Sequence, residues 1–415
     1  MVESGVGELK ILCFSGREHH YKRLSPVVNE LRSRGHDVKY IISDNGVHNM
    51  HLATDYLVPA GEQYVHAMQF FTSPMMLAVN EITKVTLQRI YAQNGTVDWV
   101  DPFWMTGAVR EMSELLLAFT NMLQAYKPDA VMILHEANFF CKLLAYLCKQ
   151  AHVPCISFQE GLLRHRDQST QGKFNLASEY SHLILMWSEK AKQAYVEAGV
   201  TEDRLMVTGI PHLDSHLLRK ADKEFQQKKA EGKYLLGFRP DQKLVVFAPP
   251  QLARYEGNVD RALSQLAEWS MDTMTQMAMC FHPFEANETF QSIQTAFQNH
   301  PYTKLVMPNV ADTIDVIALA DVVISQHSTV AIETLALGIP FVELDLDQVG
   351  VLESLVDQEV ATRVGPNEFK KIDAILQGNG LPNYVLVNEW VINNVGPRDG
   401  QASKRAANEI ERAIA

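Results

Sequence analysis

Short apolar runs alternate with amphipathic stretches along most of the chain. A near-continuous apolar run is typical of a parallel strand that is buried on both faces, and the stretches between the runs have helical spacing. This alternation predicts an α/β domain that is built on a parallel sheet. In the first half, the apolar runs cover residues 9–15, 38–43, 129–134, 153–158, 183–187 and 205–208.

The same alternation starts again in the second half, after a strongly charged stretch at residues 215–233. We therefore predict the fold class α/β, with two Rossmann-like domains whose parallel sheets face an inter-domain cleft. The predicted limits are an N-terminal domain at 1–214, a linker at 215–234, a C-terminal domain at 235–398 and a C-terminal helix at 399–415. The apolar runs of the second half cover residues 244–248, 276–281, 304–307, 321–325 and 341–344.

Residues 47–125 are less regular and are rich in aromatic residues and methionines. We expect several helices there, including one from about residue 107 to residue 126. Packing into the core is the commoner reason for such a composition. The alternatives are a groove for an acceptor, contact with a membrane surface, and contact with a second copy of the chain.

Residues 320–345 read as strand, polar loop, helix and strand. A turn from strand to helix presents unpaired N–H groups and the positive end of a helix, which favour an anion such as phosphate. We therefore predict that Ser328 and Thr329 hold a phosphate, with His327 beside them, and that Glu333 accepts a hydrogen bond from a ribose hydroxyl. The alternative is an ordinary capped helix with a surface glutamate at position 333.

Polar residues also follow other predicted strands, and ligands of parallel sheets bind beyond the carboxyl ends of the strands. Gly16 stands at the first strand-to-helix turn, and Pro249 follows the first strand of the second half. His282 could donate a hydrogen bond to a phosphate or leaving-group oxygen, because Pro283 holds it in an extended conformation. We assign Gly16, Pro249 and Pro283 to ligand binding and His282 to catalysis.

Glu160 is the preferred general base. It follows a strand, and Gly161 allows a sharp turn that exposes it. Partial shielding in a cleft is expected to raise the pKa of its carboxyl group towards neutrality, where it can remove a proton. The alternative is a surface glutamate that caps the next segment, and the rivals are His19, His20 and the pair His135-Glu136.

Composition limits the function further. The formal net charge of −12 argues against general nucleic-acid binding, which requires a basic face. The five cysteines include no CxxC pair, and no ligand spacing typical of a metal site occurs, so we expect no metal and a reducing cytoplasm. The start of the chain lacks the apolar core of a signal peptide, and no apolar run approaches the ~20 residues of a membrane span. The expected location is the cytoplasm or the inner face of the membrane.

Three short motifs are similar to those of GT-B glycosyltransferases: Gln159-Glu160-Gly161, His282-Pro283 and Ser328-Thr329. The resemblance is nearest to bacterial capsule and surface-polysaccharide transferases, namely the sialyl-, Kdo- and CDP-glycerol glycerophosphotransferase branch. The UDP-N-acetylglucosamine 2-epimerases are relatives of that branch. The sequence departs from the transferase pattern at Gln159, where the family has an acidic residue, and at His327.

The resemblance implies a GT-B fold and an inverting, metal-independent glycosyltransferase. Its donor would be a CMP-, CDP- or UDP-linked sugar bound to the second domain, and its acceptor a glycan or glycolipid hydroxyl. It also implies that Glu160 is the base and that His282 is the acid or a phosphate ligand. One alternative is a nucleotide-sugar epimerase, although the His-Arg segment that those enzymes carry after the first strand of domain two is absent. The other is a non-catalytic nucleotide-sugar-binding protein on the same fold.

Overall fold

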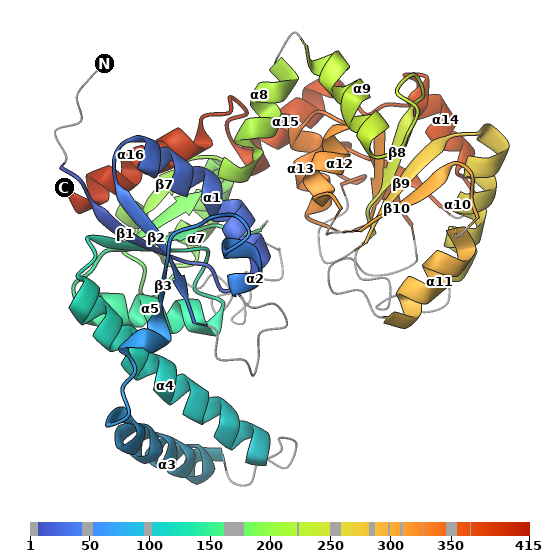
Figure 1. Ribbon diagram of the computed structural model, residues 1–415. Helices are drawn as coiled ribbons and strands as arrows, with labels where there is room; N and C mark the ends of the chain where they lie inside the picture. Colours follow the sequence, from blue (N-terminus) through green and yellow to red (C-terminus); the bar gives the residue numbers. More distant parts are fainter. Residues whose placement is uncertain are drawn as a thin grey trace.

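The computed structural model describes residues 7–43, 53–94, 102–161, 178–221, 224–249, 259–281, 287–297, 299–307, 310–326, 328–345, 355–365 and 367–415. The chain forms two parallel sheets, each covered by helices (Figure 1). The first sheet has the strand order β3-β2-β1-β4-β5-β6-β7, and all its pairs are parallel. Its strands are β1 (Lys10–Phe14), β2 (Asp37–Ile42), β3 (Tyr64–His66), β4 (Ala130–Ile133), β5 (Cys155–Phe158), β6 (Leu183–Met186) and β7 (Leu205–Val207).

The second sheet has the order β10-β9-β8-β11-β12-β13 and is also parallel throughout. The prediction of two Rossmann-like α/β domains is therefore confirmed, whereas the exact domain limits stay a prediction. The strands of the second sheet are β8 (Leu244–Phe247), β9 (Gln276–Cys280), β10 (Thr303–Val306), β11 (Val322–Ser325), β12 (Phe341–Leu344) and β13 (Thr362–Val364).

Helices cover both faces of each sheet. Those of the first half are α1 (Glu18–Ser33), α2 (Ala53–Leu57), α3 (Met75–Asn94), α4 (Pro102–Tyr126), α5 (Phe139–Gln150), α7 (Glu189–Glu197), α8 (Asp214–Ala221) and α9 (Phe225–Leu235), with short 3-10 turns η1 (Ala67–Phe70), η3 (Glu202–Arg204) and η4 (Pro211–Leu213). Those of the second half are α10 (Val259–Thr273), α11 (Asn287–Phe297), α12 (Thr313–Ala318), α13 (Val330–Ala336), α14 (Lys370–Leu376), α15 (Tyr384–Val395) and α16 (Ala402–Ile414).

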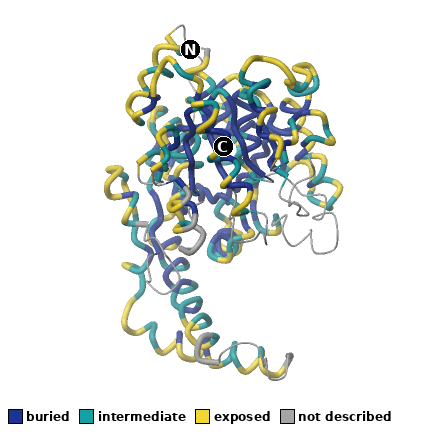
Figure 2. Tube along the Cα trace, turned by 90° about the vertical axis from the view of Figure 1, so that its right-hand side faces the viewer, coloured by how far each residue is buried: buried dark blue, intermediate teal, exposed yellow. Residues whose placement is uncertain are grey.

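Alternate residues of each strand pack on opposite faces of its sheet. In β1, Ile11 and Cys13 pack with helices α1 and α16, whereas Leu12 and Phe14 pack with α4 and α5. The residues of β8 divide in the same way between two clusters. Figure 2 shows a buried centre surrounded by half-buried and exposed segments. Burial on both faces explains why the strands read as near-continuous apolar runs.

Helices α3 and α4 pack side by side and extend away from the first sheet (Figure 1). Leu115 and Phe119 of α4 are buried in the core of that sheet, whereas Leu77 of α3 is 78% exposed. Core packing therefore explains the apolar composition of α4 near the sheet, and contact with a membrane or a second copy stays a prediction. None of the helices that the structure describes combines the length and the apolar character of a membrane span.

Two segments connect the domains, and they touch at a pair of glycines. Gly209 follows β7, and Gly396 follows α15; both have positive φ angles, of 89° and 88°. A Cβ atom on Gly396 would overlap the carbonyl oxygen of Trp187 and lie 3.6 Å from the Cα atom of Gly209. Glycine is therefore required at position 396 for two reasons, its backbone angle and this close approach.

The last helix, α16, returns to the first domain, where it packs against α1 (Figure 1). Asp214 accepts hydrogen bonds of 3.0 and 2.7 Å from the first two N–H groups of α16 and so caps it. Near the other end, the Glu411 carboxylate lies 2.9 Å from Arg34 Nη1 and 2.9 Å from His36 Nε2. The chain therefore crosses between the domains twice.

Candidate active site

Glu160 lies just beyond the carboxyl end of β5, in a turn that Gln159 holds in place. The Gln159 side chain is buried; its Nε2 donates to the Gly161 carbonyl at 2.8 Å, and its Oε1 accepts from the Trp187 N–H at 2.9 Å. An ionised carboxylate only accepts hydrogen bonds, so it could not make both contacts. The residue that departs from the transferase pattern thus has a structural task in this chain.

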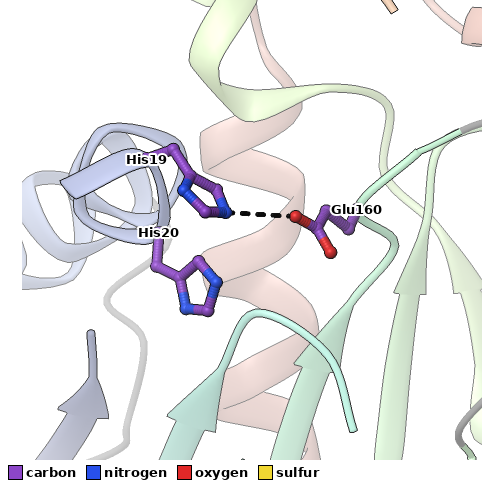
Figure 3. Close-up of side chains that lie close together, drawn as sticks. All are labelled: His19, His20 and Glu160. Carbon is purple, nitrogen blue, oxygen red and sulfur yellow. Dashed lines mark hydrogen bonds and ion pairs between the residues drawn. The ribbon is translucent and has the colours of Figure 1, made fainter. Parts of the chain in front are cut away.

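Three side chains from two other elements meet the Glu160 carboxyl group. His19 Nε2, from the first turn of α1, lies 3.2 Å from Glu160 Oε1 (Figure 3). His135 Nε2, just after β4, contacts Glu160 Oε2. One helical turn beyond His19, Arg23 Nη1 donates to the Glu160 carbonyl at 2.5 Å and lies 3.9 Å from Oε1. These groups meet because β1, β4 and β5 are neighbours in the sheet, so their carboxyl ends share one edge.

The tautomer of His135 follows from its backbone contact. The Ala137 N–H group donates to His135 Nδ1 at 3.1 Å, so this nitrogen is the acceptor. In the neutral ring the hydrogen is then on Nε2, which donates it to Glu160. His135 therefore fixes the orientation of the Glu160 carboxylate.

The surroundings keep Glu160 ionised. Burial raises the pKa of its carboxyl group, but the hydrogen bonds from His135 and His19 and the charge of Arg23 outweigh burial and hold the pKa well below its usual range. The raised pKa that we expected from the sequence is therefore wrong in direction, because the sequence did not reveal these partners. Glu160 is a weak base by itself, and it is well placed to stabilise a protonated His19. Its catalytic role stays a prediction.

Two of the rival residues, Glu136 and His20, are buried. Glu136 is fully buried and accepts hydrogen bonds from the backbone N–H groups of Tyr180, at 3.1 Å, and Ser181, at 2.6 Å. It therefore holds the chain before β6 rather than facing a substrate. His20 is 1% exposed, and burial together with the neighbouring His19 lowers its pKa to about 2, so the ring is neutral at neutral pH.

The predicted phosphate loop of the second domain lies beside Glu160. A Cβ atom on Gly161 would lie 4.0 Å from Thr329 Cγ2, so the two segments adjoin. Ser328 Oγ accepts from the Val330 N–H at 3.3 Å, and the Thr329 hydroxyl makes no capping bond. The structure thus brings together two of the segments that the sequence singled out, whereas phosphate binding by Ser328 and Thr329 stays a prediction.

Glu333 is held by a histidine of the first domain. Its Oε1 lies 3.2 Å from His212 Nε2, and both side chains are mostly buried. His212 lies in η4, shortly after β7. The sequence analysis missed His212 and Arg23; for Arg23, its spacing of four residues from His19 on α1 was a usable signal. Ribose binding by Glu333 stays a prediction.

The remaining candidates are placed as follows. Gly16 follows β1, where a Cβ atom would lie 3.1 Å from the ring of Phe14, a tight contact, and its role in ligand binding stays a prediction. Pro249 is buried beyond the carboxyl end of β8. Three further candidates, His282, Pro283 and His327, lie outside the described residues.

Comparison with known proteins identifies the family. Residues 106–372 match the family model described as UDP-N-acetylglucosamine 2-epimerase. No curated protein matches the sequence.

Among solved structures, the UDP-GlcNAc 2-epimerase from Neisseria meningitidis, bound to UDP-GlcNAc, has a TM-score of 0.64 and 14% identity, covering 97% of this chain and 100% of that chain. The UDP-GlcNAc 2-epimerase from Methanocaldococcus jannaschii has a TM-score of 0.63 and 14% identity, covering 98% and 100%. A glycosyltransferase from Rickettsia africae has a TM-score of 0.56 and 14% identity, covering 98% and 99%. At these identities the structures show a shared fold.

The family match overturns the glycosyltransferase activity that we expected from the motifs. The matching model describes an isomerase, which converts a single substrate and needs no acceptor. The expectation was wrong because strand-end motifs on a GT-B-like fold position a nucleotide sugar for either reaction. The relation to the epimerases is confirmed, and neither the polysaccharide-transferase branch nor a glycan acceptor has support.

Proposed function

The chain belongs to the UDP-N-acetylglucosamine 2-epimerase family, and on this basis we propose that it binds a UDP-linked N-acetylhexosamine and inverts the C2 carbon of the sugar. The observation that carries the proposal is the family match, which spans both Glu160 and the segment from Ser328 to Glu333. UDP is preferred to CMP or CDP because the Neisseria structure is bound to UDP-GlcNAc and a structure of the Methanocaldococcus enzyme holds UDP-GlcNAc and UDP.

Inversion of a carbon that carries hydrogen requires a base that removes a proton and an acid that returns one to the opposite face. At C2 the electron pair left by the proton forms a C1–C2 double bond as the C1–O bond to UDP breaks. Return of a proton to the other face of C2 and re-formation of the C1–O bond to UDP then give the epimer. His19 and Glu160 suit proton transfer, because their side chains are 38% and 33% exposed and lie 3.2 Å apart. In this proposal His19 takes the proton, the ionised Glu160 stabilises the resulting imidazolium, and His135 positions Glu160. Gly161, the residue after Glu160, adjoins Thr329 of the predicted phosphate loop, which supports a substrate position between them.

Solvent exchange tests this function directly. The protein is incubated with UDP-GlcNAc in D2O, and the nucleotide sugar is followed by NMR and mass spectrometry. We expect deuterium at C2 and the appearance of the C2 epimer. Glu160→Gln and His19→Gln should lose the exchange but still bind UDP.

A matched control is His152→Asn, which changes an exposed histidine before β5, at the opposite end of that strand from Glu160. His152 has a φ angle of 55°, which asparagine tolerates. The control should exchange as the wild type does. Binding of UDP by the wild type without exchange or epimer would overturn the proposal and favour a non-catalytic nucleotide-sugar-binding protein.

A further inference from the structure

We propose that His19, His20 and Glu160 form a binding site for one divalent transition-metal ion, with Zn²⁺ as the ion that best fits the ligand set. One ligand atom from each of the three side chains lies within 4.8 Å of the other two. Figure 3 shows the two rings and the carboxylate around one common space. The sequence showed no such site, because the two histidines and the glutamate lie far apart along the chain.

The distance between the first pair of ligands already suits a metal. Zinc–nitrogen and zinc–oxygen bonds are about 2.0–2.1 Å long, so the edge of a tetrahedral site measures about 3.3 Å. His19 Nε2 and Glu160 Oε1 are 3.2 Å apart. Only the His20 ring has to move closer to complete the site, and it lies next to His19, with a ring separation of 4.4 Å.

His20 supplies an independent observation. It is 1% exposed, and its Nδ1 atom is buried without a hydrogen-bond partner among the described residues. A buried nitrogen without a partner destabilises the folded state, and native structures rarely tolerate one. A metal ion bound between His20 and Glu160 would give this ring the partner that the protein itself does not provide.

The surroundings of Glu160 are those of a metal ligand. The carboxylate uses Oε1 towards His19, while its Oε2 accepts the hydrogen bond from His135, whose ring is in turn held by the Ala137 N–H. Hydrogen bonds of this kind orient a ligating carboxylate. His135 is accordingly a positioning residue for Glu160 and not a fourth ligand.

The ligand chemistry selects the ion. Two imidazole nitrogens and one carboxylate suit zinc and similar transition metals, whereas Mg²⁺ and Ca²⁺ require mostly oxygen ligands. Three protein ligands leave one position open for water or a substrate oxygen. The neutral histidines and the single carboxylate leave the bound ion with a net charge of +1.

Metal binding does not rest on the proposed function, because it is measured without nucleotide sugar. Isothermal titration of the metal-depleted full chain with Zn²⁺, together with metal analysis, should give one tight site per chain. His19→Gln and Glu160→Gln should weaken that site by about 100-fold or more, since even residues behind the ligands contribute about 10–100-fold. His152→Asn should leave it unchanged, and thermal melting confirms that each variant is folded.

The absence of tight binding to the wild type, or equal affinity in the His19 and Glu160 variants, would overturn the site. His135→Gln gives a second check, since it should weaken Zn²⁺ binding less than loss of a ligand does. One consequence rests on the proposed function: the ion takes the lone pairs that proton transfer needs, so Zn²⁺ should inhibit C2 exchange and a chelator should restore it. Full exchange at saturating Zn²⁺ would refute that consequence and leave the binding result intact.

Discussion

Replacing Gln159 with glutamate should make stability depend on pH in a defined way. In the wild type, Gln159 donates to the Gly161 carbonyl and accepts from the Trp187 N–H. A protonated glutamic acid can make both bonds, because its O–H replaces the amide donor. An ionised glutamate loses the donor and sets a buried negative charge against the Gly161 carbonyl oxygen.

The magnitude follows from linkage. The unfolded glutamate has a pKa of about 4.3, and loss of one buried hydrogen bond with an unsatisfied carbonyl costs about 1–3 kcal/mol. This cost raises the folded-state pKa of residue 159 by roughly one to two units, at about 1.4 kcal/mol per unit. The raised folded pKa means that the variant matches the wild type below about pH 4 and loses about 1–3 kcal/mol as the pH rises to 7.

Urea unfolding of Gln159→Glu and wild type at pH 4, 5, 6 and 7 measures this difference. Gln159→Met is the matched control, since it removes both hydrogen bonds without adding a titratable group, and its destabilisation should not change with pH. A destabilisation of Gln159→Glu that is equal at all four pH values, or that is absent at pH 7, would refute the structural role of Gln159.

Three further changes test other contacts. Glu411→Gln removes the carboxylate that pairs with Arg34 and His36 and should cost about 3 kcal/mol in urea unfolding, as expected when a mostly buried pair loses one partner. Burial raises the pKa of Asp321, but the Leu244 N–H and two lysines outweigh burial and lower the pKa. The carboxylate therefore stabilises the folded state above about pH 4, and this stabilisation is lost as the pH falls. Asp321→Asn should lower the free energy of unfolding at pH 7 and much less at pH 3, as measured by urea unfolding. Lys22→Met removes a solvent-exposed ion pair with Asp312 and should change the free energy of unfolding by less than about 1 kcal/mol. A larger loss would show that this ion pair is not screened by solvent.

The sequence predicted the strands of both sheets except the edge strands β3 and β13, and it did not predict the strand order. Apolar runs such as residues 153–158 predicted buried strands, because burial on both faces leaves little room for polar residues. The meeting of His19, His135 and Glu160 depends on β1, β4 and β5 being neighbours, which no local pattern encodes. The direction of the Glu160 pKa shift depended on the same neighbours.

Activity was harder to predict than fold for a related reason. The motif around Glu160 marks where a nucleotide sugar can meet polar side chains, which is a property of the sheet edge and not of the reaction. Gln159 was interpreted as a substituted acid, although its partners, Gly161 and Trp187, give it a structural role. The Trp187 contact links positions 28 residues apart and has no signature in the sequence.

The paired crossing at Gly209 and Gly396 has a mechanical consequence. A single linker would let one domain swivel freely about the chain axis, whereas two touching segments resist torsion and leave bending as the soft motion. The resistance to torsion depends on α16, the helix that follows Gly396, because Asp214 and Glu411 anchor this helix to the first domain. Removal of residues 399–415 would therefore allow the two domains to twist as well as bend relative to each other.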